Sequence, residues 1–454
     1  MIGELKRMLG LVQADYADIR YELRSDAEIV NESGELKSLS SCEADGFVLR
    51  VLAGGGFATI AFTRPEDAPK AAAKALADAL LLSRLGRRPV RLAPVAAAVG
   101  KVLPRLGIDP ASRTMEEKVG LLEGYDRVAR SSPRIAASSL RYFETRRDRA
   151  FASTEGAEVE ERLVTTGIQG MLTSRSGALV QNIRCNAGGS DGYGGVLGLE
   201  PYFEERARLV VDLLDAAPAK GGAYSVVLNP NMAGVFTHEA FGHFSEADII
   251  EDMPSMRARM RLGERLGAPG LTIVDDPAME GVLGHYRYDD EGVPARRVVL
   301  MEDGVLRGRL HSRRTAAAFG EEPNGHAVAE DYRYAPIVRM GTIFIEPRGE
   351  SLDSLLAAAG EGLYLLDAKG GQTAGRNFTF GAQYGYEIKG GKRGRMVRDI
   401  NISGDLYETL GDIEAIGSDF YLSKIGGCGK GQTNIRSCHG GPHVLVRKLV
   451  VGGA

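Results

Sequence analysis

The chain has 454 residues, of which 44% are hydrophobic and 26% charged, and its net charge of −4 corresponds to a pI near 6.1. This balance offers no basic excess for binding phosphates, so nucleic acid is not expected as a partner. The longest apolar stretch, residues 92–103, contains Lys101 and falls short of the ~20 residues of a membrane span. The charged N-terminus lacks a signal-peptide core, and the scattered cysteines fit a reducing compartment, so we expect a cytoplasmic protein with no membrane partner.

The N-terminal half alternates strand and helix patterns. Residues 16–62 read as strands separated by Gly-rich breaks at Gly46 and at residues 54–56, and residues 135–182 read as a second run of strands. Helical patterns cover three further segments, residues 65–85, 115–132 and 201–219. Pro218 and the pair Gly221-Gly222 close the last helix. We therefore expect a first domain at residues 1–220 that combines antiparallel strands with helices.

The C-terminal half reads as mostly strands. Residues 223–236 predict a buried strand and a turn that lead directly into a helix over residues 237–253. Residues 296–312 predict a hairpin around Asp303-Gly304, a dipeptide preferred in type I′ turns. Further strands are expected within residues 342–347, 363–368, 376–403 and 443–451. The sequence thus predicts an α+β protein with a β-rich second domain, residues 221–454, that carries one helix of special interest.

That helix contains the stretch THEAFGH, in which His238, Glu239 and His243 lie within six residues. Histidines at i and i+4 share one helix face, as in the His-Glu-x-x-His motif of zinc proteases. A spacing of i and i+5, at roughly 100° per residue, separates the side chains by about 140°. A π-bulge would bring them back to one face, and Gly242 would permit the distortion or the close approach of a neighbour. We therefore predict a distorted helical turn at Gly242.

If this turn binds zinc, a catalytic site needs three protein ligands and an open position. His238 and His243 would supply two ligands, and Glu239 would accept a proton from the zinc-bound water. The alternative is an exposed His238, a solvated Glu239 and a structural His243 in the core. The residues alone leave the third ligand open among Glu246, Asp248, His285, His311, His443, Cys428 and Cys438.

Several segments resemble the TldD branch of the TldD/PmbA metalloprotease family. They include THEAFGHFSEAD, DDEGVPARRVVLMEDGVLRGRL, GGQTAGRNFTFGAQYGYEIKGG, GGCGKGQ and the closing KLVVGG. The resemblance implies Zn²⁺ held by His238, His243 and Cys428, with Glu239 as the general base. It also implies an N-terminal α+β domain, a β-rich C-terminal domain, and assembly as a homodimer or as a heterodimer with a paralogous subunit. Members of the family are peptidases that act on unstructured peptides.

The combined interpretation is a zinc-dependent metallopeptidase that hydrolyses unstructured peptides or proteins bound in extended form. Glu239 would assist the attack of zinc-bound water on the peptide carbonyl. Two alternatives are a zinc amidase or deacylase acting on small substrates, and a non-catalytic regulatory or binding subunit that contains structural zinc. The late group Cys438, His439 and His443 stays open as a second metal site or as a feature without function.

Overall fold

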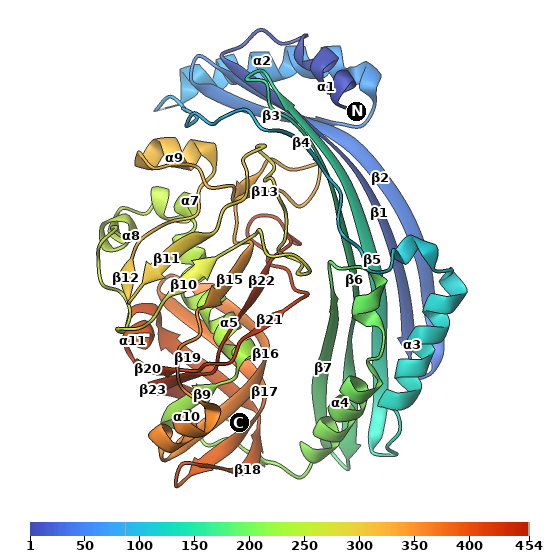
Figure 1. The fold of residues 1–454 in the computed structure, drawn as a ribbon, viewed down its shortest axis with the longest axis vertical. Helices are drawn as coiled ribbons and strands as arrows, with labels where there is room; N and C mark the ends of the chain where they lie inside the picture. The colour runs from blue at the N-terminus through green and yellow to red at the C-terminus, as the bar shows by residue number, and fades with distance from the viewer. Residues whose placement is uncertain (87, 453–454) are drawn as a thin grey trace.

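The computed structural model describes residues 1–86 and 88–452. Its N-terminal part is built on a seven-stranded sheet with the order β3-β2-β1-β5-β6-β4, in which β7 also pairs with β6. Long strands of 17 to 19 residues curve past the C-terminal part of the molecule (Figure 1). The strands are β1 (Tyr16–Glu32), β2 (Glu35–Ala53), β3 (Gly56–Phe62), β4 (Val99–Val102), β5 (Ile135–Ser153), β6 (Glu158–Ser176) and β7 (Leu179–Gly189).

Two pairs of helices cover this sheet at its two ends. The first pair packs on the upper end in Figure 1, where an alanine-rich face of α2 meets β2 and β3. The second pair packs on the lower end, and Thr114 and Glu117 form a capping box that fixes where α3 begins. These helices are α1 (Ile2–Leu9), α2 (Ala68–Leu85), α3 (Met115–Ala129) and α4 (Glu200–Asp212), and short 3₁₀ turns cover Pro65–Asp67, Pro110–Ser112 and Tyr193–Val196.

The C-terminal part contains a strand ring and a second sheet. An eight-stranded sheet has the order β16-β9-β23-β19-β17-β18-β8, with β20 on β23, and the pairing of β16 with β17 closes five strands into a ring. Its strands are β8 (Ala217–Pro218), β9 (Gly222–Leu228), β16 (Gly362–Ala374), β17 (Asn377–Lys389), β18 (Lys392–Arg398), β19 (Ile400–Asp405), β20 (Ile413–Ile416) and β23 (Val444–Gly452).

The second sheet has the order β12-β11-β10-β15-β22-β21. Its strands are β10 (Ile273–Asp275), β11 (Val298–Glu302), β12 (Val305–Leu306), β15 (Thr342–Ile345), β21 (Tyr421–Ser423) and β22 (Cys438–Gly441), and a separate pair joins β13 (Ala327–Val328) to β14 (Ile337–Val338). The helices are α5 (Pro230–Thr237), α6 (His243–Ser245), α7 (Ala247–Glu251), α8 (Pro254–Arg259), α9 (Arg313–Phe319), α10 (Leu352–Ala359) and α11 (Leu406–Gly411).

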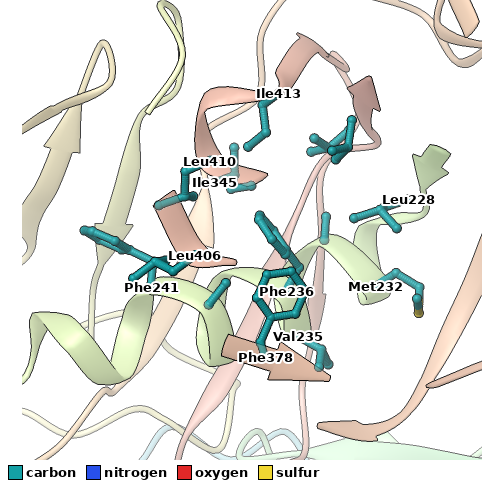
Figure 2. Close-up of a cluster of buried hydrophobic side chains, with 14 of the residues drawn as sticks. Leu228, Met232, Val235, Phe236, Phe241, Ile345, Phe378, Leu406, Leu410 and Ile413 are labelled. Atoms are coloured by element: carbon teal, nitrogen blue, oxygen red, sulfur yellow. The ribbon is translucent and has the colours of Figure 1, made fainter. Parts of the chain in front are cut away.

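Helix α5 lies inside the largest hydrophobic core, between the strand ring and the second sheet. Met232 and Phe236 are fully buried, and Phe236 packs edge-on against Phe378 of β17 at a ring-centroid distance of 5.5 Å (Figure 2). Burial of an aromatic side chain of this size stabilises the fold by ~1.5–3 kcal/mol. The core therefore fixes the rotation of α5, and with it the direction of the side chains that follow.

The predicted α+β fold is confirmed, and so is the Asp303-Gly304 turn, in which both residues have the positive φ angles of a type I′ hairpin, 50° and 74°. The predicted break at Gly46 is wrong. Gly46 lies within β2 and pairs with Glu22, and a Cβ there would collide with the ring of Tyr332. The glycine therefore serves close packing and not a turn. The division at residue 220, the nucleic-acid exclusion and the dimeric assembly stay predictions. No helix in the described ranges is long and apolar enough to cross a membrane.

Buried ion pairs join the two parts of the chain. Asp18, Arg20 and Glu22 alternate along β1, so they share one face of the sheet. That face meets the loop at residues 289–291, where Arg50 reaches Asp18 at 2.6 Å and Glu291 at 2.9 Å. The side chains of Asp18, Arg50 and Glu291 are each at most 4% exposed. Removing one partner of an ion pair buried this deeply leaves the other charge uncompensated, which is strongly destabilising.

Replacing Arg50 by methionine should therefore leave the carboxylates of Asp18 and Glu291 buried without a counter-charge. We expect the free energy of unfolding to fall by about 3–5 kcal/mol, measured by urea denaturation. The control is Arg64→Met, because the Arg64 side chain is 67% exposed and its loss should change stability by no more than ~0.5 kcal/mol. A similar small effect of both substitutions would contradict a stabilising role for the buried pairs.

Candidate metal centre

His238 and His243 lie on one side of a helix because the helix changes its hydrogen bonding between them. α5 begins after Asn229, whose side chain accepts a hydrogen bond from the backbone N–H of Met232 at 2.9 Å. A π-helical turn follows over residues 238–242, and the backbone N–H of His243 donates to the carbonyl of His238. The expected π-bulge is confirmed, and the imidazole ring centroids are 5.0 Å apart.

Gly242 is required in this turn for space. Its backbone is ordinary right-handed helix, with φ −56°, but a Cβ there would collide with the sulfur of Met340 and would lie 2.9 Å from Cδ1 of Ile343. Ile343 belongs to β15, in the sheet that also contains β22. The glycine thus lets the π-helical turn lie directly against this sheet.

Cys428 joins the two histidines from a distant hairpin. Its Sγ lies 3.0 Å from Nε2 of His238 and 3.5 Å from Nε2 of His243. The three donor atoms lie within 4.8 Å of one another, and they form the one such group of three detected in the described residues. Zinc prefers nitrogen and thiolate ligands in a group of this kind. Nε2 of each histidine is directed to the shared centre beside the cysteine sulfur. The residues therefore fit a zinc ion.

A short backbone pairing holds Cys428 in place. The N–H of Cys428 donates to the carbonyl of Ile435 at 3.0 Å, and the return bond from the N–H of Ile435 is 3.1 Å long. Lys430, two residues after the cysteine, contacts Asp248 at 2.7 Å and Glu246 at 3.0 Å. The hairpin is thus tied to the segment that follows His243 by an ion-pair network as well as by the donor cluster.

Glu246 is the central charge of this network. Its carboxylate is fully buried, lies 3.2 Å from Nδ1 of His243, and has Arg339 on its other side at 3.4 Å. Burial alone would raise the pKa of Glu246, but Lys430, His243 and Arg339 lower it to about 2. The carboxylate is therefore ionised at neutral pH and can orient the His243 ring with Nε2 directed to the metal centre.

The pKa values of the three donors follow their surroundings. Burial, and then the proximity of His243, lowers the pKa of His238 to about 4. Burial also acts to lower the pKa of His243, but its hydrogen bonds to Cys428 and Glu246 raise it to about 10. Burial acts to raise the pKa of the Cys428 thiol, yet His243 and Arg339 lower it overall. The cluster therefore favours a positive charge beside the Cys428 thiolate, and a bound metal ion can supply that charge.

Glu239 is held beside the donor cluster by β16. The Oγ1 of Thr373 lies 2.7 Å from the backbone oxygen of Glu239 and 3.0 Å from its Oε2. A Cβ on Gly371 would lie 2.7 Å from Cγ of Glu239, so glycine leaves room for the carboxylate at that position. Glu239 is partly exposed and faces the same cavity as the donors.

Two cavities meet at Cys428. One has a volume of about 720 Å³ and is lined by His238, Glu239 and His243, together with Met253 and Met256 near α8. The other, of about 710 Å³, extends towards β6, β7 and α4 of the N-terminal part. Both are lined by Val235, Gly370, Gly427, Cys428, Gly429 and His439. The centre is therefore open on two sides.

The other candidate ligands are not part of the donor cluster, although Glu246 contacts His243 on the Nδ1 side of its ring. Glu246 and Asp248 bind neighbouring side chains, His285 contacts the Pro277 carbonyl, His311 contacts Glu321, and His443 contacts Asp419. In the late group, Cys438 accepts a hydrogen bond from Gly284, while the ring of His439 lies 6.0 Å from that of His238. The members of the late group thus point to different partners. Among the described residues, they form no second metal cluster.

Sequence reasoning missed the supporting residues Thr373, Arg339 and Lys430. The pair Gly370-Gly371 before Thr373 indicates that another segment approaches closely, but it does not identify that segment. Lys430 lies next to the Gly-rich segment that contains Cys428. Arg339 lies in a segment without a motif. Their roles follow from contacts between segments about 90 to 180 residues apart, such as the 182 residues between Asp248 and Lys430.

Comparisons with known proteins agree with this architecture. Three models of PmbA/TldA metallopeptidase domains match the chain, the first domain at residues 17–81, the central domain at 108–217 and the C-terminal domain at 221–453. A metalloprotease of Synechocystis sp. is 37% identical over 97% of this chain and 95% of its own length. A zinc metalloprotease TldD homolog of Saccharolobus solfataricus is 32% identical over 75% of this chain and 77% of its own.

Solved structures share the fold. A proposed modulator of a DNA gyrase from Thermotoga maritima superposes with a TM-score of 0.81, covers 99% of both chains and is 20% identical. TldE from Thermococcus kodakarensis superposes with a TM-score of 0.76, covers 99% of both chains and is 18% identical. At these identities the likeness establishes the fold alone.

The family resemblance drawn from the sequence is thus confirmed by domain matches along the chain and by close relatives of nearly equal length. The chain belongs to the PmbA/TldD family, and it is a metallopeptidase.

Proposed function

We propose that the protein is a zinc-dependent peptidase that hydrolyses unstructured peptides bound in an extended conformation. The observation that carries this proposal is the convergence of His238, His243 and Cys428 at a point open to two cavities, with Glu239 on the same helical turn. A relative is named as a zinc metalloprotease, and the donor set fits that metal.

In this proposal the three donors would hold zinc, which supplies a Lewis acid that polarises a carbonyl and acidifies water. Glu239 accepts a proton from the attacking water and passes it to the leaving amine. Thr373 holds the Glu239 side chain from one side, while Glu246 fixes the orientation of His243 from behind. The pairing of β16 with β17 shifts register between Ala368 and Gly371, where Gly370 and Gly371 line the cavity beside the donors.

The edge of β16 offers a surface for a peptide backbone. β16 pairs with β9 only over residues 362–365, whereas residues 370–373 line the cavity beside the donors. An extended peptide can add to such an edge through main-chain hydrogen bonds, which recognise the chain independently of most side chains. Cavities on both sides of Cys428 favour a peptide that continues past the reacting bond over a small amide or acyl substrate.

Replacing Glu239 by glutamine should remove the proton acceptor and keep the metal ligands. We expect kcat on an unfolded protein such as casein to fall by about 10²–10⁴-fold, with the zinc content by elemental analysis unchanged. A parallel assay on acylated small amides separates a peptidase from an amidase. Full activity in Glu239→Gln would refute the assigned role of this residue.

Replacing Glu246 by glutamine should loosen His243, because the neutral amide lacks the charge that fixes the imidazole. We expect zinc affinity, measured by competition with a chromogenic chelator, to fall by about 10–100-fold. Asp248→Asn is the matched control, since Asp248 also contacts Lys430 but is not a contact of His243. Equal losses in the two variants would show that the lysine, and not the orientation of His243, controls affinity.

Removal of the metal separates a catalytic ion from a structural one. If zinc is catalytic, a chelator should abolish peptide hydrolysis while the protein keeps its circular dichroism spectrum, because the hydrophobic core around α5 does not depend on the ion. Added zinc should restore the activity. Cooperative unfolding on chelation would instead support a regulatory subunit with structural zinc.

A further inference from the structure

Arg436 is a buried charge without a counter-charge. Eight arginines of the described chain are buried, and seven of them have a carboxylate oxygen within 4.0 Å. Arg436 is 8% exposed and has no such partner among the described residues. An isolated buried charge costs several kcal/mol, so its position requires an explanation other than stability.

The hydrogen bonds of Arg436 leave most of its donors unused. One terminal nitrogen donates to Oγ1 of Thr165 at 2.5 Å and the other to Oγ of Ser190 at 3.2 Å. A guanidinium has five N–H donors in a planar fork, and the buried Nε has no partner. This planar fork matches the two oxygens of a carboxylate.

The surroundings of Arg436 are positive as well as buried. Burial, followed by the charges of Arg147 and Arg149, lowers the pKa of Arg436 to about 9, so the side chain is still charged at neutral pH. The nearby Glu161 is already bound to Arg149 at 2.5 Å and to the backbone N–H of Arg287 at 2.7 Å. The neighbouring groups therefore leave the charge of Arg436 available to an added anion.

Arg436 borders two cavities. The larger, of about 440 Å³, lies where β6 meets the segment around residues 280–287, and its size suits a small ligand. Five cationic side chains and three carboxylates line it, namely Lys101, Arg105, Arg162, Arg287 and Arg436 against Glu161, Asp191 and Glu280. Lys101, Arg162 and Arg287 are paired with Glu160, Asp148 and Glu280. Among the described residues, Arg105 and Arg436 are the lining cations without a carboxylate partner, and they favour an anionic occupant.

The smaller cavity, of about 310 Å³, borders Arg436 and adjoins the cavity that touches Cys428, and four arginines and four carboxylates line it. It shares Gln169, Gly426 and Asn434 with the cavity that touches Cys428. Arg436 also follows Ile435, the residue whose backbone pairs with Cys428. Arg436 therefore lies beside cavities that adjoin the metal centre, on the side from which a bound peptide would extend.

We propose that the guanidinium of Arg436 binds a carboxylate group at the boundary between the N-terminal sheet and the C-terminal part. The carboxylate has two possible sources, a free small carboxylic acid in the larger cavity or the carboxyl terminus of a bound peptide. The second source rests on the proposed peptidase function, whereas the first does not.

The first arm of the test measures binding of free carboxylates to the metal-loaded full-length protein. Sodium acetate and sodium glutarate, compared with sodium chloride at equal ionic strength, should raise the Tm of the native protein in a concentration-dependent way. Arg436→Met should lose this rise. Arg436→Lys, which keeps the charge without the planar fork, should retain a weaker one.

A matched control separates damage to the fold from loss of the ligand. Arg309 is buried and paired with Glu321, and it lines none of the cavities described here. Arg309→Met should lower the Tm in every salt and should leave the rise caused by carboxylates intact. If Arg436→Met behaves in the same way as Arg309→Met, Arg436 has a structural role and the proposal is overturned.

The second arm compares peptides that end in a free carboxylate with the same peptides ending in an amide. If the substrate supplies the carboxylate, KM of the native protein should be about 10-fold or more lower for the acid, and Arg436→Met should remove this difference with kcat on the amide preserved. If no peptide hydrolysis is observed, the Tm measurements of the first arm still test whether Arg436 binds a carboxylate. A native protein that responds neither to free carboxylates nor to the peptide terminus overturns the proposal.

Discussion

The candidate metal centre depends on one change of hydrogen bonding in a helix. A regular α-helix would place His238 and His243 nearly on opposite faces, because the phase between them is roughly 140° at 100° per residue. The π-helical turn accommodates one extra residue, so the two imidazole rings return to the same side of the helix. Its position is fixed from both ends, since Asn229 caps the start of α5 and Phe236 is locked in the core. The turn can widen at this point because Gly242 lies against Met340 without a Cβ.

The third donor is positioned by a second, independent contact between the same two segments. Cys428 meets the histidines, and Lys430 meets Glu246 and Asp248 just beyond them. The ion pairs are not part of the donor cluster itself, so they can hold the cysteine hairpin near the helix before a metal binds. This arrangement limits the conformational entropy that metal binding must overcome. A site prepared in this way is consistent with an ion that can be removed without loss of the fold.

Local features of the sequence predicted local features of the structure. The i+5 spacing of two histidines around Gly242 sufficed to predict the distorted turn, and Asp303-Gly304 sufficed to predict its hairpin. The third donor could not be chosen from the residues, because Cys428 approaches His238 across 190 positions of sequence, and only the family resemblance singled it out. Gly46 misled the strand prediction, since a glycine that admits the Tyr332 ring looks the same in sequence as one that begins a turn.

The buried arginines in the described part of the chain are paired with carboxylates, with one exception. Arg50 and Arg20 on the N-terminal sheet each meet a carboxylate of the loop at residues 289–291. These pairs compensate each other's desolvation and hold the sheet against the C-terminal part. Arg436 crosses the same boundary but meets only the hydroxyls of Thr165 and Ser190. Because the fold pairs its other buried arginines, the unpaired one is better explained by a ligand than by imperfect packing. Its neighbour Ile435 pairs with Cys428, which places the uncompensated charge next to the segment that carries the third donor of the candidate metal centre.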